Sequence, residues 1–394
     1  MQGFFPASAV LQERPMGTIP KCGSCGLLKT CRSPKMVVAG DGARRVLVVG
    51  EAPGAVEDEE GEPFVGPAGQ HLRDVLRGMG VRLNRDAWIT NSLICRPPNN
   101  ATPTKDQIGY CRPNLVRSIE ENAPRVILAL GRAALVSVIG PYWKEDIGEM
   151  SRWVGWTIPL ENHWVIPTYH PSYLLRMDNR LLNRMFEEHL ETAFTMEDEP
   201  PRQPDWRSKI DLLYDEEEII DALERMDRKD DWAAVDYEGN CLKPEYPRGK
   251  IYSLAVSTPL RAISFPWVGK AIDAAGRFLA SPNTRKIASN CKMEERWTRK
   301  IFGHGVNNWG WDTMLAAHCL DNRRGICSLK FQALVKLGVS IYNKNVEPFL
   351  KSHKGHYNRI HEVDSTSLLT YGGMDAILER YLARVQREEM GYAD

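Results

Sequence analysis

The first half of the chain alternates between short apolar runs typical of strands and amphipathic runs typical of helices. The strand-like runs cover 45–50, 88–95, 125–131 and 164–170, and the helix-like segments that follow them cover 69–80, 105–121, 132–140 and 180–194. This βαβα alternation predicts a parallel sheet with helices on both faces, a three-layer αβα arrangement.

A polar stretch with three prolines and no periodicity, TMEDEPPRQPDWRSK, covers 195–209 and is typical of a linker. After it, an amphipathic helix is expected over 215–227. Three strand-like runs follow at 232–238, 250–258 and 261–267, and helical segments dominate from there to the end. We therefore expect a first domain over 1–197, a linker over 198–208, and a second domain over 209–394 with a mixed sheet covered by helices.

Three polar residues lie in or just after strand-like runs of the first half: Glu51, Asn91 and His170. Ligands of doubly wound sheets bind outside the carboxyl ends of the strands. We expect these three side chains to converge there.

The composition of the 394 residues is that of a globular protein, with 43% hydrophobic residues and 51 basic residues balanced by 51 acidic ones. Zero net charge gives no argument for nucleic acid, although a local basic groove is compatible with it. No apolar run is long enough to span a membrane, and residues 1–15 lack a signal-peptide pattern. Nine cysteines without an export signal indicate a reducing, cytoplasmic compartment.

Four cysteines have spacings that suit a metal centre. Cys22 and Cys25 form a CxxC pair, and Cys95 and Cys111 lie further along the chain. Four thiolates can hold zinc or a 4Fe–4S cluster. The spacing alone is also compatible with a CxxC pair plus two buried cysteines, and Cys31 competes as a ligand.

Glu51, Phe64, Asn91 and His170 together would equip a pocket for an extrahelical nucleotide. Phe64 offers a flat apolar face to a base, and Asn91 can both donate and accept hydrogen bonds at a base edge. His170 can stabilise negative charge on a leaving base. The alternative is structural, with Phe64 in the core and His170 capping a strand.

The stretches GEAPGAVEDEEGEPFVGPAG, TNSLICRPPNNATPT, RVILALG and PTYHPSYLLR resemble, in order and spacing, the successive motifs of family 4 uracil-DNA glycosylases. The resemblance covers residues 20–194 and implies the αβα fold of those enzymes. It also implies a 4Fe–4S cluster on Cys22, Cys25, Cys95 and Cys111 rather than on Cys31.

The resemblance further implies roles in cleaving the N-glycosidic bond of deoxyuridine. The loop containing Gly50 and Ala52 would approach the deoxyribose, and Phe64 would stack on the flipped uracil. Glycosylases of the GQDPYH class have a water-activating aspartate where this chain has Ala52, so the neighbouring Glu51 is expected to polarise water.

The remaining roles concern the leaving base and the vacated stack. Asn91 and His170 would stabilise the uracil anion. Leu174, Leu175 and Arg176 are candidates for the wedge that fills the space left by the base, with simple packing as the alternative for the leucines.

The second half contains carboxylates at spacings that share a face. Asp236 and Glu238 are two apart on an expected strand, and Tyr371 and Asp375 are four apart on an expected helix. Glu294 lies four residues after Asn290. Each pair alone is weak evidence for a metal site, because exposed carboxylates on helices are usually just solvated.

Together, AAVDYEGN, IASNCKMEERW, WDTMLAAHCLD, SLKFQALVKLG and YGGMDAILERYL resemble the motifs of DEDDy 3′–5′ exonucleases, especially the proofreading domains of family A DNA polymerases. The resemblance covers 209–394 and implies a ribonuclease H-like fold with two Mg²⁺ or Mn²⁺ ions. It implies metal ligation by Asp236, Glu238, Glu294 and Asp375, with Tyr371 orienting the attacking water.

One position departs from that pattern, because the third acid is usually an aspartate and here is Glu294. Oxygen ligation tolerates the extra methylene if the helix shifts or a water intervenes. Asp312 is a substitute ligand, but DTMLAAHCL suits Asp312 better as a helix N-cap.

The sequence thus predicts a bifunctional hydrolase that excises uracil from DNA and degrades DNA 3′ ends. Only a short tail follows the last exonuclease motif before Asp394, so we expect any polymerase that it proofreads for to be a separate chain. The alternative is an exonuclease whose first domain only recognises uracil or DNA, or docks on a replisome partner.

Overall fold

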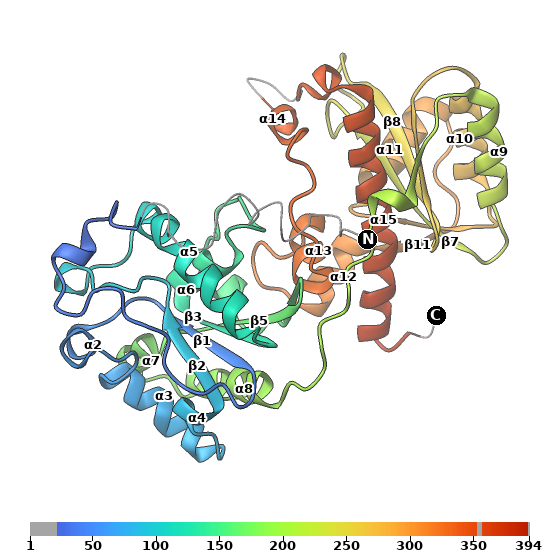
Figure 1. Cartoon of the computed structure of the whole chain (residues 1–394). Helices are drawn as coiled ribbons and strands as arrows, with labels where there is room; N and C mark the ends of the chain where they lie inside the picture. The colour runs from blue at the N-terminus through green and yellow to red at the C-terminus, as the bar shows by residue number, and fades with distance from the viewer. Residues whose placement is uncertain (1–21, 353–356, 393–394) are drawn as a thin grey trace. The chain divides into compact units, whose positions relative to one another are not determined.

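The computed structural model describes residues 22–352 and 357–392, so the expected absence of a signal peptide at 1–15 lies outside the described residues. The chain divides into two compact units, a first domain up to Arg202 and a second domain from Gln203 (Figure 1). This division lies inside the segment 198–208. No helix in the described ranges has the length and apolarity that a membrane crossing requires.

The first domain contains one five-stranded sheet in the order β2-β1-β3-β5-β4. The strands β1, β2, β3 and β5 are parallel, and β4 pairs antiparallel with β5 at the edge. The strands are β1 (Val46–Gly50), β2 (Ala87–Asn91), β3 (Val126–Leu130), β4 (Ile158–Leu160) and β5 (His163–Thr168). Strand β4 was not expected; it arises because Glu161, with a φ of 53°, reverses the chain tightly before β5.

Helices cover both faces of this sheet, as the alternation predicts. The helices are α2 (Ala55–Glu60), α3 (Pro67–Gly78), α4 (Leu83–Asp86), α5 (Lys105–Asn122), α6 (Gly131–Ile139), α7 (Pro171–Met177) and α8 (Arg180–Thr195), with 3₁₀ turns at Leu27–Lys29, Pro98–Asn100 and Met150–Arg152. Residues of α3 and α8 share a core with Val46 and Val48, whereas α5 and α6 pack together, with α6 against β1, β3 and β5. The three-layer αβα prediction is confirmed.

The second domain contains a six-stranded mixed sheet in the order β11-β10-β7-β8-β9-β6. Strands β7, β8 and β9 form an antiparallel meander, while β10 and β11 run parallel to β7. The strands are β6 (Ile210–Leu212), β7 (Trp232–Gly239), β8 (Ile251–Ser257), β9 (Ala262–Pro266), β10 (Arg285–Ala288) and β11 (Trp309–Asp312). This is the mixed sheet expected of a ribonuclease H-like fold.

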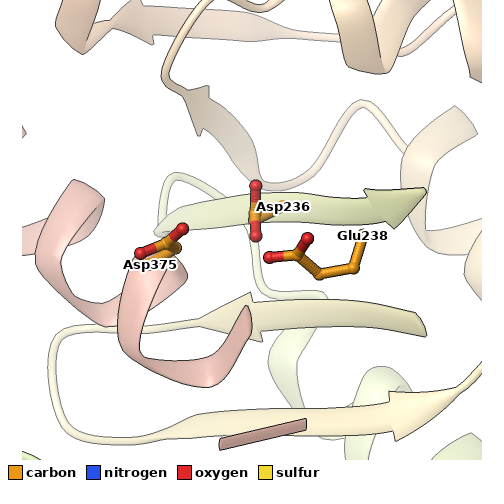
Figure 2. A group of neighbouring side chains, drawn as sticks. All are labelled: Asp236, Glu238 and Asp375. Atoms are coloured by element: carbon orange, nitrogen blue, oxygen red, sulfur yellow. The ribbon is translucent and has the colours of Figure 1, made fainter. Parts of the chain in front are cut away.

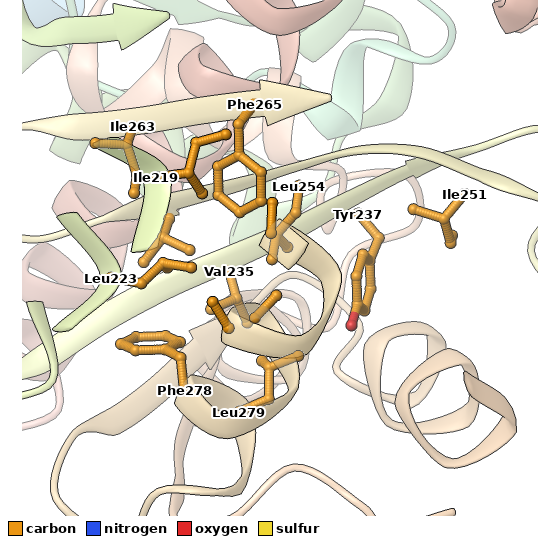
Figure 3. Packing of buried hydrophobic residues seen from close by; sticks show 14 of the residues in the cluster. Ile219, Leu223, Val235, Tyr237, Ile251, Leu254, Ile263, Phe265, Phe278 and Leu279 are labelled. Carbon is orange, nitrogen blue, oxygen red and sulfur yellow. The ribbon is translucent and has the colours of Figure 1, made fainter. Parts of the chain in front are cut away.

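The helices of this domain lie on opposite faces of its sheet. They are α9 (Glu216–Met226), α10 (Gly269–Ala280), α11 (Lys292–Phe302), α12 (Thr313–Leu320), α13 (Leu329–Leu337), α14 (Glu347–Leu350) and α15 (Ser365–Glu389), with 3₁₀ turns at Arg207–Lys209 and Ile360–Glu362. Val235 and Tyr237 of β7 pack into a core with α9 and α10 (Figure 3). Because side chains alternate along a strand, Asp236 and Glu238 point to the other face, against which α15 packs.

Candidate functional sites

A cavity of about 820 Å³ lies at the carboxyl edge of the first domain's sheet. The residues expected to converge there do so: Glu51 follows β1, Asn91 ends β2, and His170 follows β5, and all three line this cavity. Ala52, Phe64, Leu175 and Arg176 line it too, whereas Gly50 is not among its lining residues.

Gly50 allows the aromatic and the amide to approach the end of β1. A Cβ at this position would lie 2.4 Å from Asn91 Oδ1 and 2.5 Å from Phe64 Cζ. No larger residue fits without moving one of them. Gly50 therefore contributes by leaving room for Asn91 and Phe64 rather than by a contact of its own.

Phe64 adopts a backbone conformation that is costly for a bulky residue. Its φ is 59°, in the left-handed region, and its side chain is buried. The ring lies 6.3 Å from that of His170, with 31° between the planes. A strained aromatic held beside a cavity is typical of a ligand-binding position.

His170 is the N-cap of α7, and its ring is held by that helix. The backbone N–H of Ser172 donates to Nδ1 at 3.3 Å, and the Ser172 hydroxyl lies 2.8 Å from the same nitrogen. Burial, with the nearby Arg176 charge, lowers the pKa of His170 to about 4. The imidazole is therefore neutral at pH 7, with its proton on Nε2.

Glu51 is partly buried at the tip of β1. Burial raises its pKa, and the positive charge of Arg176 opposes that rise. Arg176 thus acts on two titratable groups of the cavity, favouring the carboxylate of Glu51 and the neutral imidazole of His170.

Glu57 is a cavity residue that the sequence analysis did not single out. Its carboxylate accepts from the backbone N–H of Gly54 at 3.1 Å and from that of Gly66 at 2.8 Å. It thereby joins the loop after Glu51 to the loop that carries Phe64. Glu57 is the third residue of α2, and its bond to the N–H of Gly54 is the half of a capping box that does not need an N-cap side chain; a glutamate at this position was the available signal.

The wedge candidates separate by burial. Leu174 is 2% exposed, belongs to the core formed with α3 and α8, and is not among the residues that line the cavity, which favours the packing alternative for this residue. Leu175 is 50% exposed and lines the cavity together with Arg176. Successive residues of a helix are 100° apart around its axis, so adjacent leucines face different directions.

The four cysteines expected to bind a cluster lie together. Cys22, Cys25, Cys95 and Cys111 line one small cavity, of about 20 Å³, and Cys31 is not among its lining residues. Helix α5, which carries Cys111, begins at a capping box between Thr104 and Gln107.

Backbone and amide donors surround two of these sulfurs. The N–H of Lys35 donates to Cys95 Sγ at 3.3 Å, and that of Ile94 donates to Cys111 Sγ at 3.4 Å. Burial still raises the pKa of Cys95 to about 12 and that of Cys111 to about 11. Buried thiols that already accept N–H bonds fit a metal centre, because a bound cation makes the thiolate the stable form.

In the second domain, Asp236, Glu238 and Asp375 each offer an oxygen within 4.8 Å of the others (Figure 2). The two residues of β7 face the last helix, and Asp375 lies on that helix, α15. Burial and mutual repulsion raise the pKa of Asp236 and of Glu238. Three carboxylates at this spacing fit a hard divalent cation, which removes the repulsion.

Two tyrosines contact Asp375. The hydroxyl of Tyr342 donates to its Oδ1, and Tyr371 is also hydrogen-bonded to its carboxylate. Their rings lie 6.2 Å apart. Lys330, whose charge acts on Glu238 and Asp375, lies 5.5 Å from the centre of the Tyr371 ring. Tyr342 and Lys330 were not anticipated, because they come from segments with no acidic motif.

Glu294, the longer third acid, lies in the first turn of α11 and is 3% exposed. Its charge interacts with that of Asp236. Asp312 caps α12 through the N–H groups of Met314 and Leu315, and also accepts from the N–H groups of Asn290 and Cys291. With both oxygens engaged by backbone donors, Asp312 is the N-cap that the sequence indicated.

Comparisons of the sequence with known proteins find relatives of the first domain, which carries the first site. The sequence model of the uracil DNA glycosylase superfamily matches residues 38–194. The type-4 uracil-DNA glycosylase of Thermotoga maritima is 39% identical over 183 residues, which cover 46% of this chain and 93% of that protein. That of Archaeoglobus fulgidus is 40% identical over 162 residues, covering 40% of this chain and 79% of that protein.

Solved structures similar to this chain include nucleases. Escherichia coli RNase D, an exoribonuclease, matches with a TM-score of 0.36 and 12% identity, covering 46% of each chain. The polymerase domain of Pol1 from M. smegmatis matches with a TM-score of 0.33 and 14% identity, covering 46% of this chain and 27% of that one.

Proposed function

The chain belongs to the type-4 uracil-DNA glycosylase family through its first domain, and we propose that this domain excises uracil from DNA while the second domain shortens DNA 3′ ends. The observation that carries the first activity is the cavity that collects Glu51, Phe64, Asn91 and His170. The observation that carries the second activity is the cluster of three carboxylates formed by Asp236, Glu238 and Asp375.

In the glycosylase reaction the uracil lies flipped into the cavity, stacked on Phe64. Asn91 forms hydrogen bonds to the base edge. As the bond between C1′ and N1 breaks, its electron pair moves onto uracil, and His170 donates from Nε2 to the oxygen where the charge develops. The neutral imidazole of His170 suits this step because its Nε2–H group is present at pH 7 and the ring does not need to take up a proton first.

The other half of the reaction takes place at the sugar. Glu51, as a carboxylate, stabilises the positive charge on C1′ and orients the water that attacks it. The new C1′–O bond forms as the water proton passes to Glu51 or to solvent. Leu175 and Arg176, which line the same cavity, are the residues of α7 that we assign to the space left in the base stack.

The residues that would hold the 4Fe–4S cluster are Cys22, Cys25, Cys95 and Cys111. When bound, such a cluster cross-links the N-terminal segment to the loop after β2 and to α5, so its contribution is structural. The free cysteines suit a reducing, cytoplasmic compartment.

In the exonuclease reaction, Asp236, Glu238, Glu294 and Asp375 would hold two divalent cations. When bound, these cations lower the pKa of water and stabilise the leaving 3′ oxygen. Tyr371 orients the attacking water, which gives up a proton to solvent as its oxygen forms the new bond to phosphorus. The bond to the 3′ oxygen breaks in the same step, and that oxygen takes up a proton from solvent.

The test offers end-labelled, uracil-containing DNA to the purified chain with and without Mg²⁺. Abasic sites that break in alkali report the glycosylase, and shortened 3′ ends report the exonuclease. If uracil stays in DNA while 3′ ends shorten, the first domain only recognises or docks, and the glycosylase proposal is wrong.

A further inference from the structure

Helix α15 carries a second buried carboxylate, Glu379, one turn after Asp375. It is 2% exposed. Its Oε1 accepts the backbone N–H of Ser289 at 3.2 Å, and its Oε2 has no hydrogen-bond partner among the described residues. A buried carboxylate oxygen without a partner is costly unless a cation occupies the space beside it.

Glu379 lies four residues after Asp375 and so shares its face of α15, a helix that packs against β7 and β10. The charge of Glu379 interacts most strongly with that of Asp236, then with Glu294 and Asp375. Glu294 also has an unpartnered buried oxygen, Oε2, and Asp236 has one in Oδ2. Three acids on three different elements thus each have a buried oxygen without a hydrogen-bond partner among the described residues, although Glu294 and Glu379 lie outside the group of acids whose oxygens are all within 4.8 Å of one another.

The five acids divide into two sets that share Asp236. The first set is Asp236, Glu238 and Asp375, which the charge of Lys330 also affects. The second is Asp236, Glu294 and Glu379, and burial together with the neighbouring carboxylates raises the pKa of all three. Five carboxylates and one ammonium leave four negative charges, which two divalent cations would balance.

We propose that Glu379 is the third protein ligand of the second divalent cation, together with Asp236 and Glu294. This inference rests on the proposed two-cation exonuclease and adds a residue to its binding set. The bond to Ser289 fixes Glu379 relative to the segment between β10 and α11, which leads directly to Glu294. Glu294, the unusual third acid, and Glu379 therefore act together as ligands of the same cation.

The experiment counts bound Mn²⁺ in the full-length chain from the loss of the free-ion electron paramagnetic resonance signal. Wild type should bind two ions. Glu379→Gln keeps an oxygen for the N–H of Ser289 but loses the charge, so we expect the Kd of one ion to rise at least tenfold while the other is unchanged. Glu379→Ala should show the same pattern if circular dichroism shows it folded.

Two further variants separate the possible failures. Glu388→Gln, on the same helix but exposed and paired with Arg384, is the matched control and should bind two ions as wild type does. Asp236→Ala should lose both. If Asp236→Ala loses both ions but Glu379→Gln binds two with wild-type affinity, the role of Glu379 is refuted alone. If Asp236→Ala also binds two, the proposed exonuclease site itself is refuted.

Discussion

Ser172 fixes the tautomer of His170, because its backbone N–H donates to Nδ1 at 3.3 Å and so leaves the ring proton on Nε2. The lowered pKa of about 4 keeps that ring neutral throughout the physiological range. In that range His170 can therefore act as a hydrogen-bond donor without carrying the positive charge of an imidazolium.

His170→Ala should lower the single-turnover rate of uracil release by about 10²–10³-fold, the usual cost of one donor to a developing anion. Ser172→Ala is the matched comparison, since it removes the hydroxyl but keeps the backbone bond, and its loss should be much smaller. Quench-flow measurement of released uracil tests both. Equal losses in the two variants would contradict the assignment of the donor to His170.

The acid limb of the glycosylase pH profile should report Glu51 rather than His170. Burial raises the pKa of Glu51 above its usual value, and protonation removes the carboxylate that the reaction needs. Activity should therefore fall as the pH drops through that raised pKa. Arg176→Ala removes the charge that holds the pKa down, so the acid limb should move to higher pH.

The measurement is kcat/KM for uracil release between pH 4 and 9 in wild type and Arg176→Ala. Because Arg176 also lowers the pKa of His170, the same substitution raises that pKa, and protonation of His170 then contributes in the same direction. An acid limb that stays in place, or moves to lower pH, would contradict this account.

Glu57→Ala should slow uracil release by about 10-fold to 10²-fold. The reason is that Phe64, the proposed contact to uracil, would be misplaced, and misplacing a substrate contact lowers the rate even when the reacting groups are intact. The variant frees the N–H groups of Gly54 and Gly66 and loosens the loop that holds Phe64. Glu59→Ala, on the same helix but exposed and paired with Arg32, should have no effect. Steady-state rates of uracil release by wild type, Glu57→Ala and Glu59→Ala test this prediction.

Anaerobically purified protein should be brown and contain about four irons per chain. Cys95→Ser and Cys111→Ser should lose iron and lower the unfolding temperature of the first domain, whereas Cys31→Ser should retain both. Iron analysis, the visible spectrum and calorimetry test this. Stoichiometric zinc without iron would contradict the cluster assignment.

The sequence predicts most of the first domain because each strand of a doubly wound sheet brings its last residue to the same edge. Glu51, Asn91 and His170 needed only that rule to be placed together. The short edge strand β4 was missed, because a three-residue strand formed by a tight reversal at Glu161 leaves no periodicity.

The sites were predicted less completely, for physical reasons that differ between residues. Leu174 and Leu175 are identical in type and adjacent, and only the packing of α7 decides which is buried. Glu379 looks like any helix glutamate in the sequence. Its difference from Glu388 is burial against β10, which depends on tertiary structure alone.

The two activities should be separable, because the glycosylase site as proposed uses side chains and water whereas the exonuclease site consists of ligands for hard cations. EDTA should abolish 3′ shortening and leave uracil release nearly intact. Asp236→Ala combined with Glu238→Ala should reproduce the effect of EDTA, and Glu51→Gln should do the reverse. Two gel assays on one preparation, one for abasic sites and one for 3′ ends, measure both.

Cleaving the chain near Pro201 should leave each half with its own activity, because each end of the linker packs on its own domain. On one side Glu199 pairs with Arg45 and Arg125. On the other side Trp206 is 3% exposed and packs edge-on against Tyr381 of α15, with 4.7 Å between the ring centres. Neither domain therefore loses core residues at the cut. Loss of both activities to EDTA, or to substitution of either site alone, would show a shared site or obligate coupling and contradict the two-enzyme proposal.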